Sequence, residues 1–154
     1  LVLVAHDPTR APVEPVPGLD LAGLLGGDKL AMAFVDAVPA GQYGKEALTS
    51  LGVWAAVEGN VAQTDNVRTA LALVTSGEAP MGIVYASDAI AAAAVGSRLV
   101  VLGTFPADSH RPIVYPAARL TDAASPEAAA AFLEHLSSDS ARAVFETQGF
   151  TVLK

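Results

Sequence analysis

The sequence of 154 residues contains no cysteine. This absence excludes disulfide bonds, thiolate chemistry and zinc sites built from cysteine. Basic residues are also few, because nine Lys and Arg stand against sixteen Asp and Glu, for a formal net charge of −7. The nine are scattered along the chain, so no basic patch is available to neutralise phosphates. The composition therefore argues against nucleic-acid binding.

Long apolar runs are absent as well. Hydrophobic residues make up 52% of the chain, but many of them are Ala. Stretches such as residues 89–96 fall well short of the ~20 residues that a membrane helix needs. The sequence therefore predicts a protein that is not inserted in a membrane. Residues 1–5 read as a strand and not as a signal peptide, from which we expect further sequence upstream.

The usual motifs of catalytic sites are also missing. The sequence has no Gly-x-Ser-x-Gly elbow, no phosphate-binding loop and no dinucleotide fingerprint. His6, His110 and His135 lie far apart and show no paired spacing with carboxylates, which argues against a metal site. We therefore expect neither an enzyme nor a resident cofactor.

What the chain does contain is an alternation of short apolar segments with helical ones. Strands are expected over residues 1–5, 29–35, 60–62, 81–85 and 99–105, with a last extended segment over 113–120. Helices are expected over residues 20–25, 42–51, 67–76, 126–136 and 140–148, and after a cap at Ser87-Asp88. Strands separated by helices of about ten residues predict a three-layer α/β domain with a mainly parallel sheet.

A turn of small residues opens directly into the helix expected after residue 41. The first amides of a helix have no intrahelical partner and lie at the positive end of its dipole, so they can hold an anion. Ala40 and Gly41 would let a ligand approach the backbone closely, and Pro39 presets φ near the start. A simple loop-to-helix junction explains the same residues.

Two further positions suggest the same chemistry. Val67 begins a helix, where its amide could face a ligand, although a cap by Asp65 or Thr64 accounts for this segment equally well. Tyr85 follows an apolar strand, and strand ends of α/β sheets are common ligand sites. A tyrosine there is also typical of a partly buried core residue.

Several motifs in order resemble the periplasmic molybdate-binding proteins of ABC transporters. They are VPAGQYGKEAL at 38–48, DNVRTALALV at 65–74, GIVYASDA at 82–89, TFPADSH at 104–110 and Gly149-Phe150. The resemblance covers nearly the whole chain. It implies a periplasmic-binding-protein-like lobe with C-terminal helices that belong to a second, incomplete lobe. It also implies a periplasmic location, a membrane permease as partner, and molybdate or tungstate as ligand.

In that family a tetrahedral oxyanion lies between two lobes and is held by amides and hydroxyls. The resemblance implies that Ala40 and Val67 each offer a backbone N–H and that Tyr85 offers its hydroxyl, with Arg68 outside direct contact. It further implies that residues 1–111 are the second lobe and that 112–154 are a returning part of the first. Two serine-bearing loops of the family are missing, so we expect this chain alone to bind oxyanion poorly or not at all.

The last two expected helices contain apolar side chains that need cover. Without their normal sheet, the last two helices would expose apolar side chains, which suggests self-association as a hypothesis. The side chains concerned are Ala131, Phe132, Leu136, Val144 and Phe145.

Three alternative functions remain open at this point. The same lobes could form a regulatory domain that senses oxyanions, or could bind sulfate or phosphate instead. An enzyme would have to use Asp88, His110 or Tyr85 as acid and base, and no such pair stands at suggestive spacing.

Overall fold

The computed structural model describes residues 1–153. The chain divides into two compact units, Leu1–Pro112 (unit 1) and Ile113–Lys154 (unit 2). Among the described residues, no helix has both the length and the apolar character needed to cross a membrane.

Unit 1 is built on a sheet of five strands. In chain order these are β1 (Val2–Ala5), β2 (Leu30–Ala33), β3 (Val61–Thr64), β4 (Met81–Val84) and β5 (Val100–Thr104). Their order across the sheet is β3-β2-β4-β1-β5. β2 pairs in parallel with both β3 and β4, whereas β1 is antiparallel to β4 and β5. The predicted α/β fold with a mainly parallel sheet is confirmed, with β1 as the one reversed strand.

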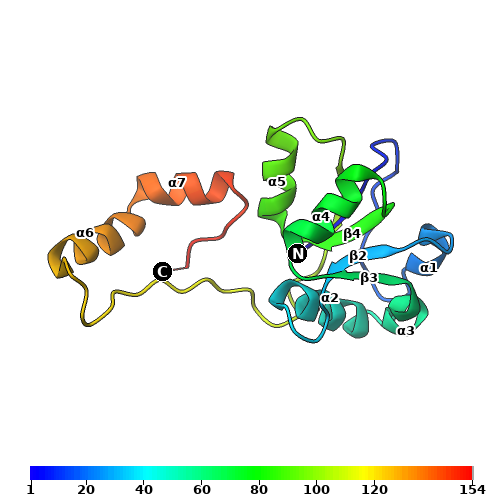
Figure 1. Ribbon diagram of the computed structural model, residues 1–154, viewed down its shortest axis with the longest axis horizontal. Coiled ribbons are helices and arrows are strands. Elements are labelled where there is room, and N and C mark those ends of the chain that lie inside the picture. The colour runs from blue at the N-terminus through cyan, green and yellow to red at the C-terminus, as the bar shows by residue number, and fades with distance from the viewer. Residues whose placement is uncertain (154) are drawn as a thin grey trace. The chain divides into compact units, whose positions relative to one another are not determined.

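Helices cover both faces of this sheet (Figure 1). On one face lie α1 (Leu21–Leu25), α2 (Pro39–Ser50) and α3 (Trp54–Val57), and on the other lie α4 (Val67–Ser76) and α5 (Ala86–Ala94). Alternation along the strands divides the core between the two faces. In β1, for example, Leu3 packs with the first group of helices, while Val2 and Val4 pack with the second.

The structure corrects the predicted start of one helix and the predicted caps of two others. α2 begins at Pro39 and not at residue 42, because proline is well suited to the first helical position, so Ala40 lies in the first turn. α4 has the predicted bounds, but its cap is Asn66, whose side chain accepts the Thr69 amide at 2.9 Å. The cap of α5 is Tyr85, without a side-chain hydrogen bond, and not the predicted Ser87-Asp88.

Two features of unit 1 were not predicted. The short helix α3 and the 3-10 turn η1 (Glu58–Asn60) connect α2 to β3. The proline-rich segment over residues 8–17 covers the edge of the sheet at β5, where the Val13 amide donates to the Leu102 carbonyl at 2.9 Å. The contact is close, since a Cβ added to Gly103 would lie 2.3 Å from the Val13 oxygen.

Over residues 113–153, unit 2 contains two helices, α6 (Pro126–Leu136) and α7 (Asp139–Thr147). The extended segment expected over residues 113–120 forms no strand, because no neighbouring strand pairs with it among the described residues. Phe150 packs edge-on against Tyr115 and Phe145, with ring centroids 5.9 and 6.2 Å away. Phe132 and Val144 are 60% and 63% exposed, so this unit presents apolar surface.

Candidate functional site

The three predicted ligand residues lie at one edge of the sheet. β3, β2 and β4 are neighbours and run parallel, so their carboxyl ends meet at the same edge. Val67 starts the helix after β3, Ala40 lies in the first turn of the helix after β2, and Tyr85 directly follows β4. Because ligands of open α/β sheets bind outside the carboxyl ends of strands, this edge is the candidate site.

The start of α2 lies against the end of β2. Ala40 is 2% exposed, and the preceding turn is closed by a hydrogen bond of 2.9 Å from the Val38 amide to the Phe34 carbonyl. Gly41 permits the contact, since a Cβ there would lie 2.2 Å from the Ala33 oxygen and 2.4 Å from that of Phe34. The helix spans twelve residues, which is long enough for a substantial dipole at its amino end.

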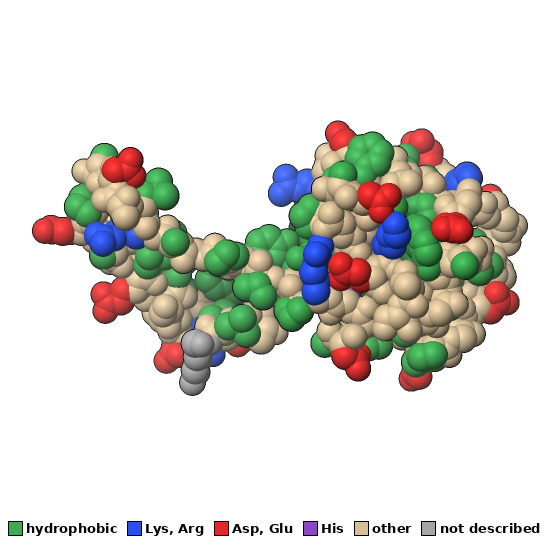
Figure 2. Space-filling model, turned by 90° about the horizontal axis from the view of Figure 1, so that it is seen from below, with side chains coloured by type: hydrophobic (Ala, Val, Ile, Leu, Met, Phe, Trp, Pro, Cys, Tyr) green, Lys and Arg blue, Asp and Glu red, His purple; other side chains and the backbone are tan. Residues whose placement is uncertain are grey.

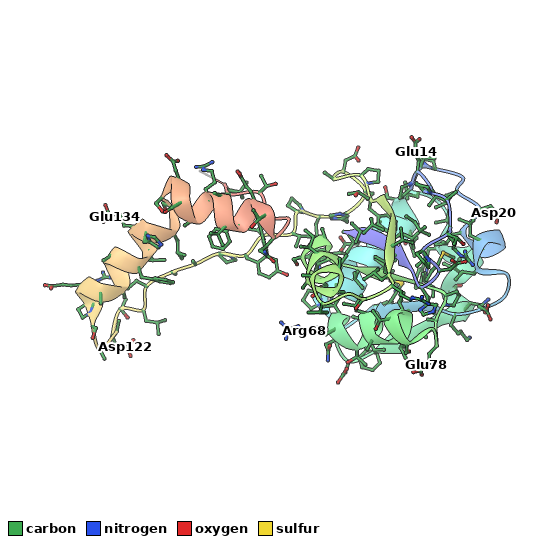
Figure 3. The ribbon with its side chains drawn as sticks, turned by 90° about the horizontal axis from the view of Figure 1, so that it is seen from above. Glu14, Asp20, Arg68, Glu78, Asp122 and Glu134 are labelled. Atoms are coloured by element: carbon green, nitrogen blue, oxygen red, sulfur yellow. The ribbon has the colours of Figure 1, made fainter. Side chains whose placement is uncertain are left out.

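The start of α4 follows the end of β3, as the start of α2 follows the end of β2. The Asn66 cap engages the amide of Thr69 and not that of Val67. Asp65 has a structural role, because its Oδ1 accepts hydrogen bonds from the Asn66 side chain at 2.9 Å and from the Thr69 hydroxyl at 3.0 Å. Arg68 is exposed and projects from the first turn of α4 (Figure 3).

Tyr85 and Asp88 form the start of α5. Tyr85 is partly buried, and Asp88 stands three residues later in the first turn of the helix. Burial raises the pKa of Asp88, although a backbone hydrogen bond from Tyr85 and the positive charge of Arg68 act in the opposite direction. Its Oδ2 is buried without a hydrogen-bond partner among the described residues. This orphaned oxygen was not predicted, because nothing in the local sequence distinguishes it from an ordinary helix cap.

Two cavities of unit 1 are lined by other residues. One, of about 580 Å³, is lined by Val35 and Arg111 together with polar residues of α2, and the other, of about 210 Å³, lies beside His6 and Glu78. Neither is lined by the three predicted ligand residues. Acidic and basic side chains are interspersed on the face of unit 1 that Figure 2 shows. No group of three His, Asp or Glu within residues 1–153 is arranged to hold a metal ion.

Comparison with known proteins identifies the family. A family model described as bacterial extracellular solute-binding protein matches residues 1–151. The chain belongs to this family. Its members bind solutes, which confirms the expectation of a binding protein and not an enzyme.

The relatives of this solute-binding protein come from several bacteria. Over 84% of the chain it is 43% identical to the molybdate-binding protein ModA of Escherichia coli, and over 88% it is 37% identical to the putative ABC transporter substrate-binding lipoprotein YvgL of Bacillus subtilis. These matches cover 48% and 50% of the two relatives. The chain thus spans about half the length of the curated relatives it matches.

Solved structures agree with this fold. The substrate-binding domain of a putative molybdenum ABC transporter from Clostridium difficile matches 99% of the chain and 63% of its own, with a TM-score of 0.76 and 28% identity. The Azotobacter vinelandii periplasmic molybdate-binding protein matches 99% of the chain and 65% of its own, with a TM-score of 0.72 and 24% identity. The predicted periplasmic-binding-protein fold is therefore confirmed for this solute-binding protein.

Proposed function

We propose that this chain is part of a periplasmic protein that captures molybdate or tungstate and delivers it to the permease of an ABC transporter. The amides of Ala40 and Val67 and the hydroxyl of Tyr85 would hold the oxyanion. The observation that carries this proposal is the position of all three at the carboxyl edge of neighbouring parallel strands. Two of the relatives are named molybdate-binding proteins, which supports the choice of ligand.

Backbone amides suit this ligand in an acidic protein. A chain with a net charge of −7 repels anions at long range, so attraction has to arise locally from oriented dipoles. The amino ends of α2 and α4 supply such dipoles. Arg68 is exposed, and in this proposal it makes no direct contact with the ligand. A rigid set of donors would favour a large tetrahedral dianion, since a smaller ion such as sulfate would leave donors unsatisfied.

The division of the chain bears on affinity. We propose that residues 1–111 form one complete lobe and that 112–154 are a returning part of the other. The half of the relatives' length that this chain does not span would contribute further donors, and each hydrogen bond to a charged group contributes about 1.5–3 kcal/mol. We therefore expect weak binding of the oxyanion by this chain alone. We also expect the apolar surface at Phe132 and Val144 to promote self-association.

The test is a titration of the isotope-labelled chain with sodium molybdate, followed by the backbone amide resonances in NMR. We expect saturable shifts at Ala40 and Val67, and smaller ones with sodium sulfate at equal concentration. Tyr85→Phe should weaken the molybdate response by about tenfold or more, because one hydrogen bond to a charged group is lost. The matched control is Tyr115→Phe, which removes a hydroxyl from an exposed tyrosine of unit 2.

Two results would contradict the proposal. One is a set of molybdate-dependent shifts confined to residues around the 580 Å³ cavity and absent from the edge of the sheet. The other is an equal response of the Tyr85 and Tyr115 variants. Sedimentation of a clean monomer at high concentration would separately exclude the self-association.

A further inference from the structure

Two consecutive residues at the end of β3 bond to the segments that lead into α2 and α4. β3 is an edge strand, and its last residues are Gln63 and Thr64. Gln63 Oε1 accepts a hydrogen bond of 3.0 Å from the amide of Val35, shortly after β2. The Thr64 hydroxyl donates to the carbonyl oxygen of Asn66, the cap of α4, at 2.8 Å. One strand end thus contacts the approaches to both helices of the candidate site.

The alternation of side chains along β3 explains this double contact. Successive side chains of a strand point to opposite faces of the sheet. Val61 packs with the core on the α2 face, so Gln63, two residues later, lies on the same face. Thr64 then lies on the other face, which α4 covers. Each of the two residues therefore bonds to the segment that enters the helix on its own side of the sheet.

On the α2 side, the bond from Gln63 supports the turn that locates the helix start. The Phe34 amide donates to the Thr64 carbonyl at 2.7 Å, and the Phe34 carbonyl accepts the Val38 amide at 2.9 Å. Val38 is the cap residue of α2 and supplies no side-chain hydrogen bond. The position of the first turn of α2 therefore depends on this turn and on its attachment to β3.

On the α4 side, the Thr64 hydroxyl lies between two carbonyl oxygens. Its Oγ1 is 2.8 Å from the Asn66 oxygen and 3.3 Å from the Met32 oxygen in β2. A hydroxyl has a single proton to donate, which the two acceptors have to share. The Asn66 carbonyl also accepts the amide of Ala70 at 3.2 Å, which is the first bond of the helix. Thr64 thus links the first turn of α4 to β2.

These contacts are better suited to fixing geometry than to raising stability. Gln63 is exposed and Thr64 is half-buried, so water competes for their hydrogen bonds and the net gain in folding free energy is small. Geometry matters more, because a site that selects a ligand by size needs its donors held within about 0.5 Å.

We propose that Gln63 and Thr64 are a pair of positioning residues that fix the starts of α2 and α4 relative to each other. The pair would thereby set the distance between the amides of Ala40 and Val67, and with it the size of the oxyanion that these amides favour. This consequence for the ligand rests on the proposed function, whereas the positioning of the two helices does not. Neither side chain would contact the ligand.

Amide hydrogen exchange tests the contact with the α2 side without any ligand. Gln63→Met removes the acceptor at similar side-chain length and should lower the protection of the Val35 amide by about tenfold, because local opening no longer breaks this bond. Gln63→Glu retains an acceptor oxygen and should preserve the protection. Fluorescence of Trp54 checks that each variant is folded.

NMR tests the contact with the α4 side in the same way. Thr64→Val removes the hydroxyl at similar shape and should shift the carbonyl carbon resonance of Asn66, whereas Thr64→Ser retains the hydroxyl and should restore it. The matched control is Thr75→Val, at another half-buried threonine, whose hydroxyl donates to the Ala72 carbonyl at 3.1 Å near the far end of α4. This control should leave the Asn66 resonance unchanged.

The double variant Gln63→Met and Thr64→Val tests the positioning itself. Residual dipolar couplings of the backbone amides should show a changed direction of α4 relative to α2. Titrations with sodium molybdate and with sodium sulfate should show that the preference for molybdate, expressed as the ratio of the two dissociation constants, falls by about fivefold or more. A merely structural role would weaken the binding of both ions equally and leave this ratio unchanged.

Three outcomes are decisive. Unchanged protection of Val35 in Gln63→Met, together with an unchanged direction of α4 in the double variant, would overturn the inference. A constant ratio of dissociation constants, with both affinities lowered, would overturn the role in size selection. If the parent chain itself gives no response to molybdate, the proposed function fails, and the measurements without ligand still decide whether Gln63 and Thr64 position the two helices.

Discussion

Replacement of Gly41 by alanine tests the placement of α2 most directly. An added Cβ would lie 2.2 Å from the Ala33 carbonyl oxygen and 2.4 Å from that of Phe34. Both are backbone atoms, so no rotamer change can relieve the clash, and the helix start has to move by roughly an ångström to restore normal contact. Overpacking of this kind costs about 1–3 kcal/mol. Alanine regains about 1 kcal/mol through its higher helix propensity.

We therefore expect Gly41→Ala to lower the free energy of unfolding by about 2 kcal/mol, since contact with rigid backbone belongs at the upper end of that range. Two other glycines make a graded series. At Gly44 the added Cβ meets the flexible end of Met32 at 2.5 Å, and at Gly59 it meets nothing within 4 Å. The loss should be smaller at Gly44, and within about 0.5 kcal/mol of zero at Gly59.

Urea unfolding followed by tryptophan fluorescence measures this series. Trp54 is the single tryptophan of the sequence and lies in α3, so it reports on unit 1. If Gly41→Ala and Gly59→Ala unfold at the same urea concentration, α2 does not pack against the end of β2 as described. The location of the Ala40 amide, and with it the candidate oxyanion site, would then be refuted.

Three other substitutions have definite expected outcomes. Burial raises the pKa of Asp88, so the contribution of this residue to stability is present below its unfolded pKa and is lost as the pH rises through its folded pKa. Asp88→Asn should remove this loss. The urea midpoint of the variant should therefore rise relative to that of the parent as the pH goes from acidic to neutral. Gly103→Ala should cost about 1–3 kcal/mol of folding free energy, because the new Cβ would lie 2.3 Å from the Val13 oxygen. It should also speed proteolysis of residues 8–17, which cover β5. An unchanged cleavage rate would contradict the packing of this segment on Gly103. Leu3→Ala, at a side chain with 0% exposure, should cost about 2–5 kcal/mol in the Trp54 assay, and a loss under 1 kcal/mol would show that Leu3 of β1 is not packed in the core.

Local sequence patterns predicted much of the fold. The bounds of α4 and α6 were predicted correctly, because the first follows a cluster of capping residues and the second has proline at its first position. The same cluster explains the wrong cap of α4. Thr64, Asp65 and Asn66 are all good caps, and only the hydrogen bond from the Thr69 amide selects Asn66.

Contacts between distant residues were beyond such patterns. Arg111 forms hydrogen bonds with Glu46 and Gln42 of α2, which are 65 and 69 residues away in the sequence, so no periodicity or motif points to them. The reversed direction of β1 is of the same kind, since a short apolar strand reads alike in either direction. For the candidate site, sequence predicted Ala40, Val67 and Tyr85, but not the orphaned oxygen of Asp88.

The position of β1 has a consequence for how the protein forms during synthesis. β1 lies between β4 and β5, so residues 2–5 gain their partners only when residues 81–84 and 100–104 have been made. Pairings between residues so far apart are slow to form, because a long loop has to close first. β1 therefore gains both of its neighbours in the sheet only after about two thirds of this chain has been made, and until then its apolar residues lack these strand partners.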